Sequence, residues 1–309
     1  MEYLKPILPM LLCFILLLAS STLTTLTIFN GIAQIVLFAL VVQLPTWKTG
    51  RMSYVDIGWP LGVAVIGIVT LTVSLALEQG AFWRVLVVSL VMVVVGSRMG
   101  IAAVLAWRDG HLERELPRYQ YQQVRWDQRG IENTRLMQQV ETFMQGISNM
   151  SFLALPAFII STNPDPAVHW LEVLGLAIWV AAFVMESVAD AQKKAFLLDM
   201  REKQLRKQVC NVGLWRYSRH PNYFAEWMVW NSLIIAAIPS WLALYQREQL
   251  VIWALLGFCT LYTSRLMYYS LVTYSGAEPA EYYSVQKRAG YRDYQQQTNR
   301  FFPGPARLK

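Results

Sequence analysis

The sequence predicts an all-α protein: a polytopic bundle of about seven or eight transmembrane helices, with cytosolic loops and a C-terminal tail that cap a site. Hydrophobic residues make up 55% of the 309 residues, charged residues only 15%, and the mean hydropathy is +0.33. Soluble chains carry about a quarter charged residues. Several apolar runs also reach the roughly 20 residues with which a helix crosses a bilayer. Lipid is therefore the expected solvent.

Eight apolar segments are candidate spans, at residues 6–25, 30–45, 55–77, 82–107, 138–161, 168–192, 222–244 and 249–273. The second is the shortest. The first contains an apolar run between Lys5 and Ala19-Ser20-Ser21, a pattern that resembles a signal peptide, but we expect it to stay because eight spans agree with the charge pattern below. We expect accessory helices in residues 1–45 and one membrane domain in residues 46–309.

Lysine and arginine mark alternate loops. They gather in residues 46–54, 108–137 and 193–221 and in the tail, whereas the intervening loops hold only Arg84 and Arg247. The positive-inside rule then predicts that the basic loops and both termini are cytosolic. The net charge of +7 is thus a topology signal, and we expect membrane lipids rather than nucleic acid as partners.

Polar and ionisable residues inside apolar spans are costly and usually face the interior of a bundle. The candidates are Asp56, Arg98, Glu186, Asp190, Asn222, Glu226 and Arg265, together with a polar stripe formed by Gln138, Glu141, Gln145 and Asn149. Each has a simpler explanation, such as a helix cap, a side chain that snorkels, or a pair with Lys193 and Lys194. Together they indicate a polar cavity open to the cytosol.

The densest polar stretch is residues 213–226, where Arg216, Arg219 and His220 precede Pro221. Proline suits the first turn of a helix, and a helix start with nearby arginines favours phosphate. The stretch predicts a site for an anionic, phosphate-bearing ligand, and the simpler alternative is a basic stop sequence docked on lipid headgroups. The cysteines and histidines have no metal-binding spacing, so no metal is expected, and no Rossmann glycine motif is present.

Residues 213–226 resemble the hallmark of bacterial membrane proteins that share the steroid 5-alpha-reductase C-terminal domain. The resemblance covers about residues 50–305. It includes residues 55–59, Arg98, residues 115–119, Gln145, residues 186–192 and Phe196, and, in the tail, Tyr291, Tyr294, Thr298 and Phe302-Pro303. The sequence departs from the family at Val93-Val94-Val95, where a tyrosine is usual, and at Leu116 and Ala225.

The resemblance implies an inner-membrane reductase that uses NADPH to reduce a C=C bond conjugated to a carbonyl in a lipophilic, steroid-like or isoprenoid substrate. It implies cofactor contacts from Arg98, Glu186, Asp190, Arg216, Tyr217, Arg219, His220, Asn222, Tyr223, Glu226, Arg265 and Tyr291. It implies a carbonyl-polarising acid at Asp56 or Tyr54, and substrate contacts from Trp59 and Gln145.

Two other classes stay open. An isoprenylcysteine-type methyltransferase also carries an Arg-His-Pro helix start and would bind S-adenosylmethionine, but Asn222 and the pair Glu186 and Asp190 favour the reductase. A non-enzymatic lipid-binding or transport protein is the third class, although the sequence shows no internal repeat.

Overall fold

The computed structural model describes residues 7–307, and in that part of the chain the secondary structure is helical, without strands. Among the described residues, seven helices are long and apolar enough to cross a membrane: residues 24–49, 55–76, 82–108, 134–161, 170–202, 221–244 and 250–287. The predicted all-α membrane class is confirmed. The chain forms two compact units, unit 1 (residues 1–172 and 236–263) and unit 2 (residues 173–235 and 264–309).

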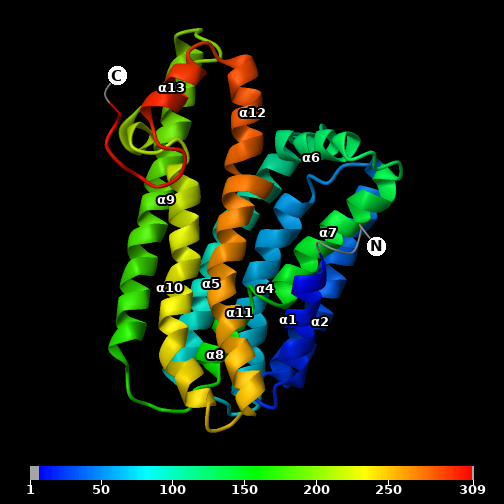
Figure 1. Cartoon of the computed structure of the whole chain (residues 1–309), viewed down its shortest axis with the longest axis vertical. Helices are drawn as coiled ribbons and strands as arrows, with labels where there is room; N and C mark the ends of the chain where they lie inside the picture. The colour runs from blue at the N-terminus through cyan, green and yellow to red at the C-terminus, as the bar shows by residue number, and fades with distance from the viewer. Residues whose placement is uncertain (1–6, 308–309) are drawn as a thin grey trace. The chain divides into compact units, whose positions relative to one another are not determined.

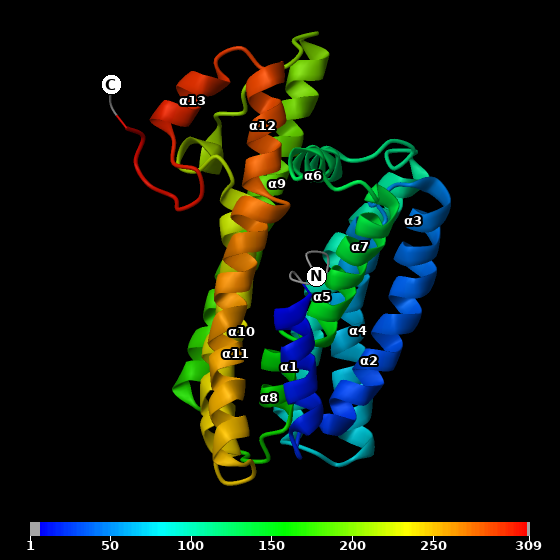
Figure 2. The same ribbon diagram turned by 45° about the vertical axis from the view of Figure 1, so that its right-hand side comes forward.

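Unit 1 contains α1 (Leu8–Ala19), α2 (Thr24–Phe38), the π-helix η1 (Ala39–Gln43), α3 (Leu44–Thr49), α4 (Val55–Ala76) and α5 (Phe82–Arg108), followed by α6 (Pro117–Gln128), α7 (Thr134–Met150) and α8 (Leu155–Ser161). The long helices lie side by side, and α6 lies across one end of them (Figures 1 and 2).

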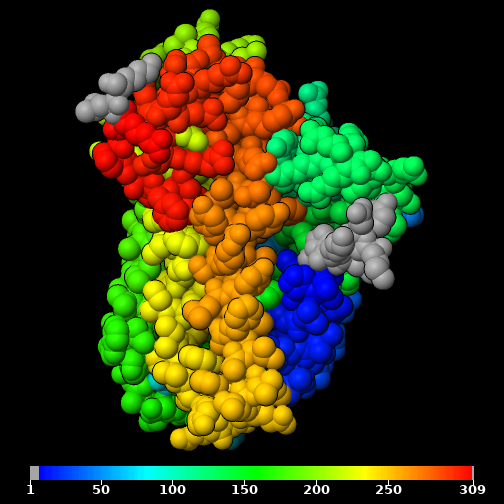
Figure 3. Space-filling model, in the orientation of Figure 1, coloured from blue at the N-terminus to red at the C-terminus, as the bar shows by residue number. Residues whose placement is uncertain are grey.

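Unit 2 contains most of α9 (Trp170–Glu202), the 3₁₀ turn η2 (Gly213–Arg216) and the first part of α10 (Pro221–Leu244). It continues with the last part of α11 (Leu250–Tyr269), the π-helix η3 (Ser270–Tyr274), α12 (Ala277–Lys287) and α13 (Tyr291–Gln297). The C-terminal tail, red in Figure 3, packs on α12, which is orange.

The first two predicted spans differ from the structure. With 12 residues α1 is about 18 Å long, short of the roughly 30 Å of a bilayer core. The predicted second segment instead extends from Thr24 to Thr49, because the wide π turn η1 lets the helix continue past Pro45. Gly50 then ends it with φ of 70°. The predicted eight spans are therefore seven long helices and one short packed helix, and the predicted boundary at residue 45 falls inside a continuous helix.

Buried polar side chains join the helices of unit 1. Gln34 Nε2 donates to the carbonyl of Gly62 at 2.8 Å, Asn30 Nδ2 to that of Asn149 at 3.1 Å, and Asn149 Nδ2 to that of Trp59 at 3.0 Å. These bonds connect α2, α4 and α7 where lipid offers no hydrogen-bond partner. They fix the start of α4, which carries the acid predicted for the substrate.

The end of unit 1 that is poor in lysine and arginine is closed by hydrogen bonds. Glu248 accepts from Ser20 Oγ at 2.7 Å and from the Thr22 amide at 2.8 Å. Arg247 donates to the Thr162 carbonyl, and Arg84 forms a buried ion pair with Glu172 at 2.5 Å. The two basic residues that deviate from the charge pattern thus have partners inside the protein.

Candidate functional site

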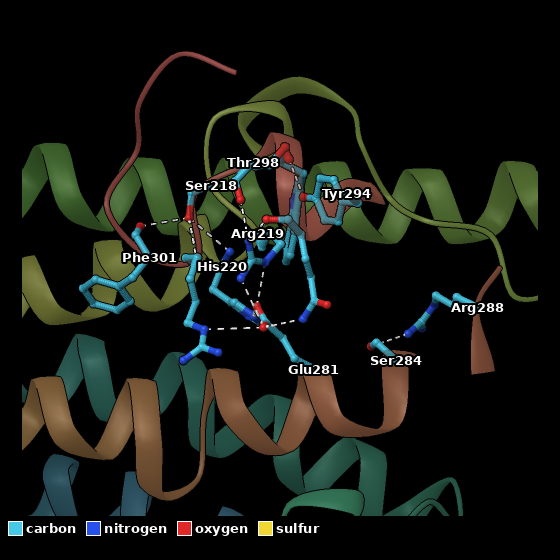
Figure 4. Close-up of polar contacts among 12 residues, drawn as sticks. Ser218, Arg219, His220, Glu281, Ser284, Arg288, Tyr294, Thr298 and Phe301 are labelled. Atoms are coloured by element: carbon cyan, nitrogen blue, oxygen red, sulfur yellow. Dashed lines mark hydrogen bonds and ion pairs between the residues drawn. The ribbon is translucent and has the colours of Figure 1, made fainter. Parts of the chain in front are cut away.

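In unit 2, Glu281 of α12 is the centre of a buried cluster (Figure 4). Arg219 donates to its two carboxylate oxygens from Nε at 2.7 Å and from Nη2 at 3.2 Å, and His220 Nε2 lies 3.1 Å from Oε1. Gln295 donates to Oε2 at 2.9 Å, and Arg300 Nε lies 3.4 Å from the same oxygen. Glu281 is 3% exposed, so its charge is satisfied entirely by these neighbours.

The same cluster fastens the tail to the loop that precedes α10. Arg219 also donates to the carbonyls of Gln295 and Thr298, and its amide donates to the Asn299 carbonyl at 2.8 Å. Ser218 Oγ donates to the Phe301 carbonyl at 2.9 Å (Figure 4). The guanidinium of Arg219, predicted as a phosphate contact, is therefore engaged with protein groups in this structure.

His220 is buried and stacks on Tyr223, with ring centroids 5.2 Å apart and planes nearly parallel. Burial lowers the pKa of His220, although the nearby Glu281 carboxylate acts in the opposite direction. The ring is therefore a structural contact to Glu281 in this geometry.

This lowered pKa predicts how stability depends on pH. As the pH falls below about 6.5, His220 takes up a proton in the unfolded chain but resists it in the folded one, so stability falls. We expect the unfolding temperature to decrease between pH 7.5 and 5.5, and to decrease less in His220→Gln. His111→Gln, which changes an exposed histidine, is the control. An equal or larger decrease in His220→Gln contradicts the assignment.

A second polar group of unit 2 joins α9 and α10. Asn222 Nδ2 donates to Asp190 Oδ1 at 3.1 Å, and one turn further along α10 Glu226 Oε1 accepts from Trp230 Nε1 at 2.9 Å. Glu186 of α9 is buried. Asn222 Oδ1 is a buried acceptor that has no hydrogen-bond partner among the described residues. The group is rich in acceptors and leaves at least one of them open to a ligand that donates hydrogen bonds.

The other predicted residues of unit 2 lie in different surroundings. Arg216 is exposed at the end of η2, Tyr217 is exposed directly after it, and Arg265 is exposed on α11. Tyr291 is buried in α13, and burial raises its pKa to about 12. It is therefore a neutral phenol at physiological pH.

In unit 1, Asp56 lies in the first turn of α4 and contacts two residues of α6. Tyr119 Oη donates to Asp56 Oδ1 at 2.6 Å, and Arg118 Nη2 lies 3.8 Å from Oδ2. Tyr54 instead accepts a hydrogen bond from Arg51 at 3.3 Å. The phenol that contacts the predicted acid is thus Tyr119.

Glu115 holds this part of α6 in place. Its carboxylate accepts from the amides of Met52 at 2.7 Å and Ser53 at 3.0 Å, and from Ser53 Oγ. Desolvation by burial raises the pKa of Glu115, against the effect of these hydrogen bonds. The residues just before α4 and the start of α6 are therefore locked together, which sets the position of Tyr119 against Asp56.

The remaining predicted residues of unit 1 are half-buried: Trp59 on α4, Arg98 on α5 and Gln145 on α7. Trp59 packs against an apolar cluster that includes Tyr119 and Trp126. Sequence reasoning did not assign roles to Tyr119, Trp230 or Glu281. The spacing of four between Glu226 and Trp230 on one helix is a local signal that was available. Nothing local marks Glu281 as the partner of Arg219.

The fold defines a multi-pass membrane protein with one buried carboxylate cluster and one acceptor-rich polar group in unit 2. The chain belongs to the family described as "Protein of unknown function (DUF1295)", which matches residues 41–298. It is 26% identical over 175 residues to "Uncharacterized protein C594.04c" of Schizosaccharomyces pombe (strain 972 / ATCC 24843), an alignment that covers 51% of this chain and 46% of the yeast protein. No solved structure shows a significant match.

Proposed function

We propose that the protein is a membrane-embedded, NADPH-dependent reductase of a C=C bond conjugated to a carbonyl in a lipophilic substrate. The observation that carries the proposal is the polar group at the start of α10, where Asn222 bonds Asp190 and keeps a buried acceptor without a partner. The order of motifs along the chain, which resembles the steroid 5-alpha-reductase domain, supports the same activity.

The residues of this group fit a nicotinamide nucleotide. Carboxylates accept hydrogen bonds from ribose hydroxyls, so Asp190, Glu186 and Glu226 suit the ribose of the nicotinamide half, which carries no 2′-phosphate in NADPH. The open Asn222 Oδ1 suits an amide N–H such as that of a carboxamide. When bound, NADPH would supply a hydride to the substrate.

The substrate side of the proposal rests on Asp56 and its neighbours in unit 1. A reduction of this kind needs a group that polarises the substrate carbonyl as negative charge develops on its oxygen. Tyr119 brings a phenolic proton to Asp56 at 2.6 Å, and Arg118 adds a positive charge. In the proposed role, Asp56 and Tyr119 would share this proton and hydrogen-bond the carbonyl oxygen of the substrate, which would take up the proton as negative charge develops on it. Tyr119 then takes the place that the sequence suggested for Tyr54.

The proposed location is a bacterial inner membrane, with the basic loops and the C-terminal tail in the cytosol. The charge pattern supports this orientation, and the internal partners of Arg84 and Arg247 account for the two residues that deviate from it. A lipophilic substrate would then enter from the bilayer.

The ligand is tested by thermal unfolding of detergent-purified protein with NADPH, NADH and S-adenosylmethionine. A ligand present at about 100 times its Kd stabilises by about 2.7 kcal/mol. We expect stabilisation by NADPH. Stabilisation by S-adenosylmethionine alone would assign the protein to the methyltransferases, and no stabilisation by any of them would favour a non-enzymatic role.

The site is tested by Asn222→Ala. Loss of a hydrogen bond to a buried ligand costs about 1–3 kcal/mol, so we expect NADPH to bind roughly 10-fold to 100-fold more weakly. The matched control is Asn211→Ala, because Asn211 is exposed and interacts with Arg216 only through its backbone carbonyl. Unchanged affinity in folded Asn222→Ala protein would remove Asn222 from the cofactor site.

A further inference from the structure

The segment that follows α9 borders a hollow of about 650 Å³. Four cationic side chains line it, Arg201, Arg206, Lys207 and Arg288, and no acidic residue is among the lining residues. Its apolar lining includes Phe196 and Met200 from the last turns of α9. Small-molecule sites have volumes of about 300–1,000 Å³ and combine apolar walls with a few polar groups. The hollow has the size and lining of such a site.

Other cations of the same basic loop have partners within unit 2. Lys203 pairs with Asp199 at 2.8 Å, Lys193 lies 4.4 Å from the centre of the Trp215 ring, and Arg219 pairs with Glu281. By contrast, no hydrogen bond or ion pair between residues 7 and 307 engages the charged groups of Arg201, Arg206 or Lys207. Like charges that converge without a carboxylate repel one another, and an anion removes that cost.

The backbone around the hollow is also unusual. Gln204 and Lys207 have φ values of 55° and 61°, a left-handed conformation that L side chains seldom adopt. The two reversals turn the chain back over the end of α9, where the Leu205 amide donates to the Met200 carbonyl at 2.8 Å. The Gln204 conformation and this bond cap the C-terminus of α9, and they determine where the segment that borders the hollow lies.

We propose that this hollow is a binding site for a phosphate-bearing small molecule with an apolar or planar portion. Arg201, Arg206, Lys207 and Arg288 would bind the phosphate, since arginine forms paired hydrogen bonds with phosphate oxygens. Phe196 and Met200 would contact the rest of the ligand. A soluble phosphate ester and a phospholipid headgroup share this chemistry. The site uses different residues from Asn222 and Asp190, and it does not depend on the proposed reaction.

The test compares two probes. One is adenosine 2′,5′-bisphosphate, titrated by calorimetry into the full chain in neutral detergent. The other is phosphatidylglycerol, compared with phosphatidylcholine in nanodiscs by the unfolding temperature. Saturable binding of the bisphosphate that persists in Asn222→Ala protein supports a soluble ester in the hollow, and stabilisation by phosphatidylglycerol alone supports a headgroup. Binding that Asn222→Ala abolishes would place the probe at the proposed cofactor site and overturn the inference. If neither probe binds, the inference is overturned.

The variant Arg206→Gln/Lys207→Gln removes two cations from the hollow and should weaken the responding probe at least tenfold, or abolish its thermal shift. The matched control is Lys194→Gln/Lys203→Gln, which removes the same charge from exposed positions that do not line the hollow. Since all four side chains are exposed, both variants should fold. Equal loss in the two double variants would show a response to net charge and would overturn the site.

Discussion

Replacing Glu281 by glutamine is expected to destabilise unit 2 by about 3–5 kcal/mol, the usual cost of removing one partner from a buried ion pair. Arg219 and Glu281 are both buried, and His220, Gln295 and Arg300 also contact the carboxylate. A neutral amide leaves the Arg219 charge uncompensated and gives donors where acceptors are needed. The thermal unfolding temperature, followed by tryptophan fluorescence, should fall by several degrees.

The same variant should loosen the tail, because Arg219 fastens residues 295–299 to the loop before α10. Trypsin should then cleave sooner after Lys287, Arg288 and Arg292. Asp293→Asn is the matched control, since it neutralises an exposed carboxylate of α13. Equal unfolding temperatures and cleavage rates in the two variants would contradict a structural role for Glu281.

Replacing Arg84 by leucine is expected to destabilise unit 1 by a similar amount. Arg84 is 1% exposed, and it donates to both oxygens of Glu172 and to the carbonyls of Asp165 and Ala167. The substitution leaves a buried carboxylate without its cation and two carbonyls without donors. A fall of about 3–5 kcal/mol in unfolding free energy is expected from chemical denaturation.

The double variant Arg84→Leu/Glu172→Leu separates the cost of leaving one buried charge alone from the cost of removing the whole ion pair. Removing both charges avoids a lone buried ion, so the double variant should be more stable than Arg84→Leu alone. The single variant Glu172→Leu completes the comparison. If the double variant loses as much stability as Arg84→Leu and Glu172→Leu lose together, the two side chains are not energetically coupled. In that case the internal partner of Arg84 would not explain why a basic residue is tolerated there.

The site could be predicted only in part, as particular residues show. Asn222 and Asp190 are both predicted from the sequence as polar residues inside apolar spans, and in the structure Asn222 Nδ2 lies 3.1 Å from Asp190 Oδ1. Arg219 and His220 were interpreted as anion contacts from their charge and their place before Pro221, but they contact Glu281 about 60 residues later. Asp56 was selected, whereas its contact with Tyr119, 63 positions away, was not.

The sequence by itself determined that this is a helical membrane protein, and it determined most of the long helices, because hydropathy and length are local properties of a chain. It did not determine that the helix would pass Pro45, since a π turn relieves the clash only when neighbouring helices hold it. Tertiary structure alone decided which charges are neutralised inside the protein and which remain open to a ligand. Arg219 and Arg206 look alike in sequence, but burial against Glu281 neutralises the first, while the second stays exposed beside a hollow without carboxylates.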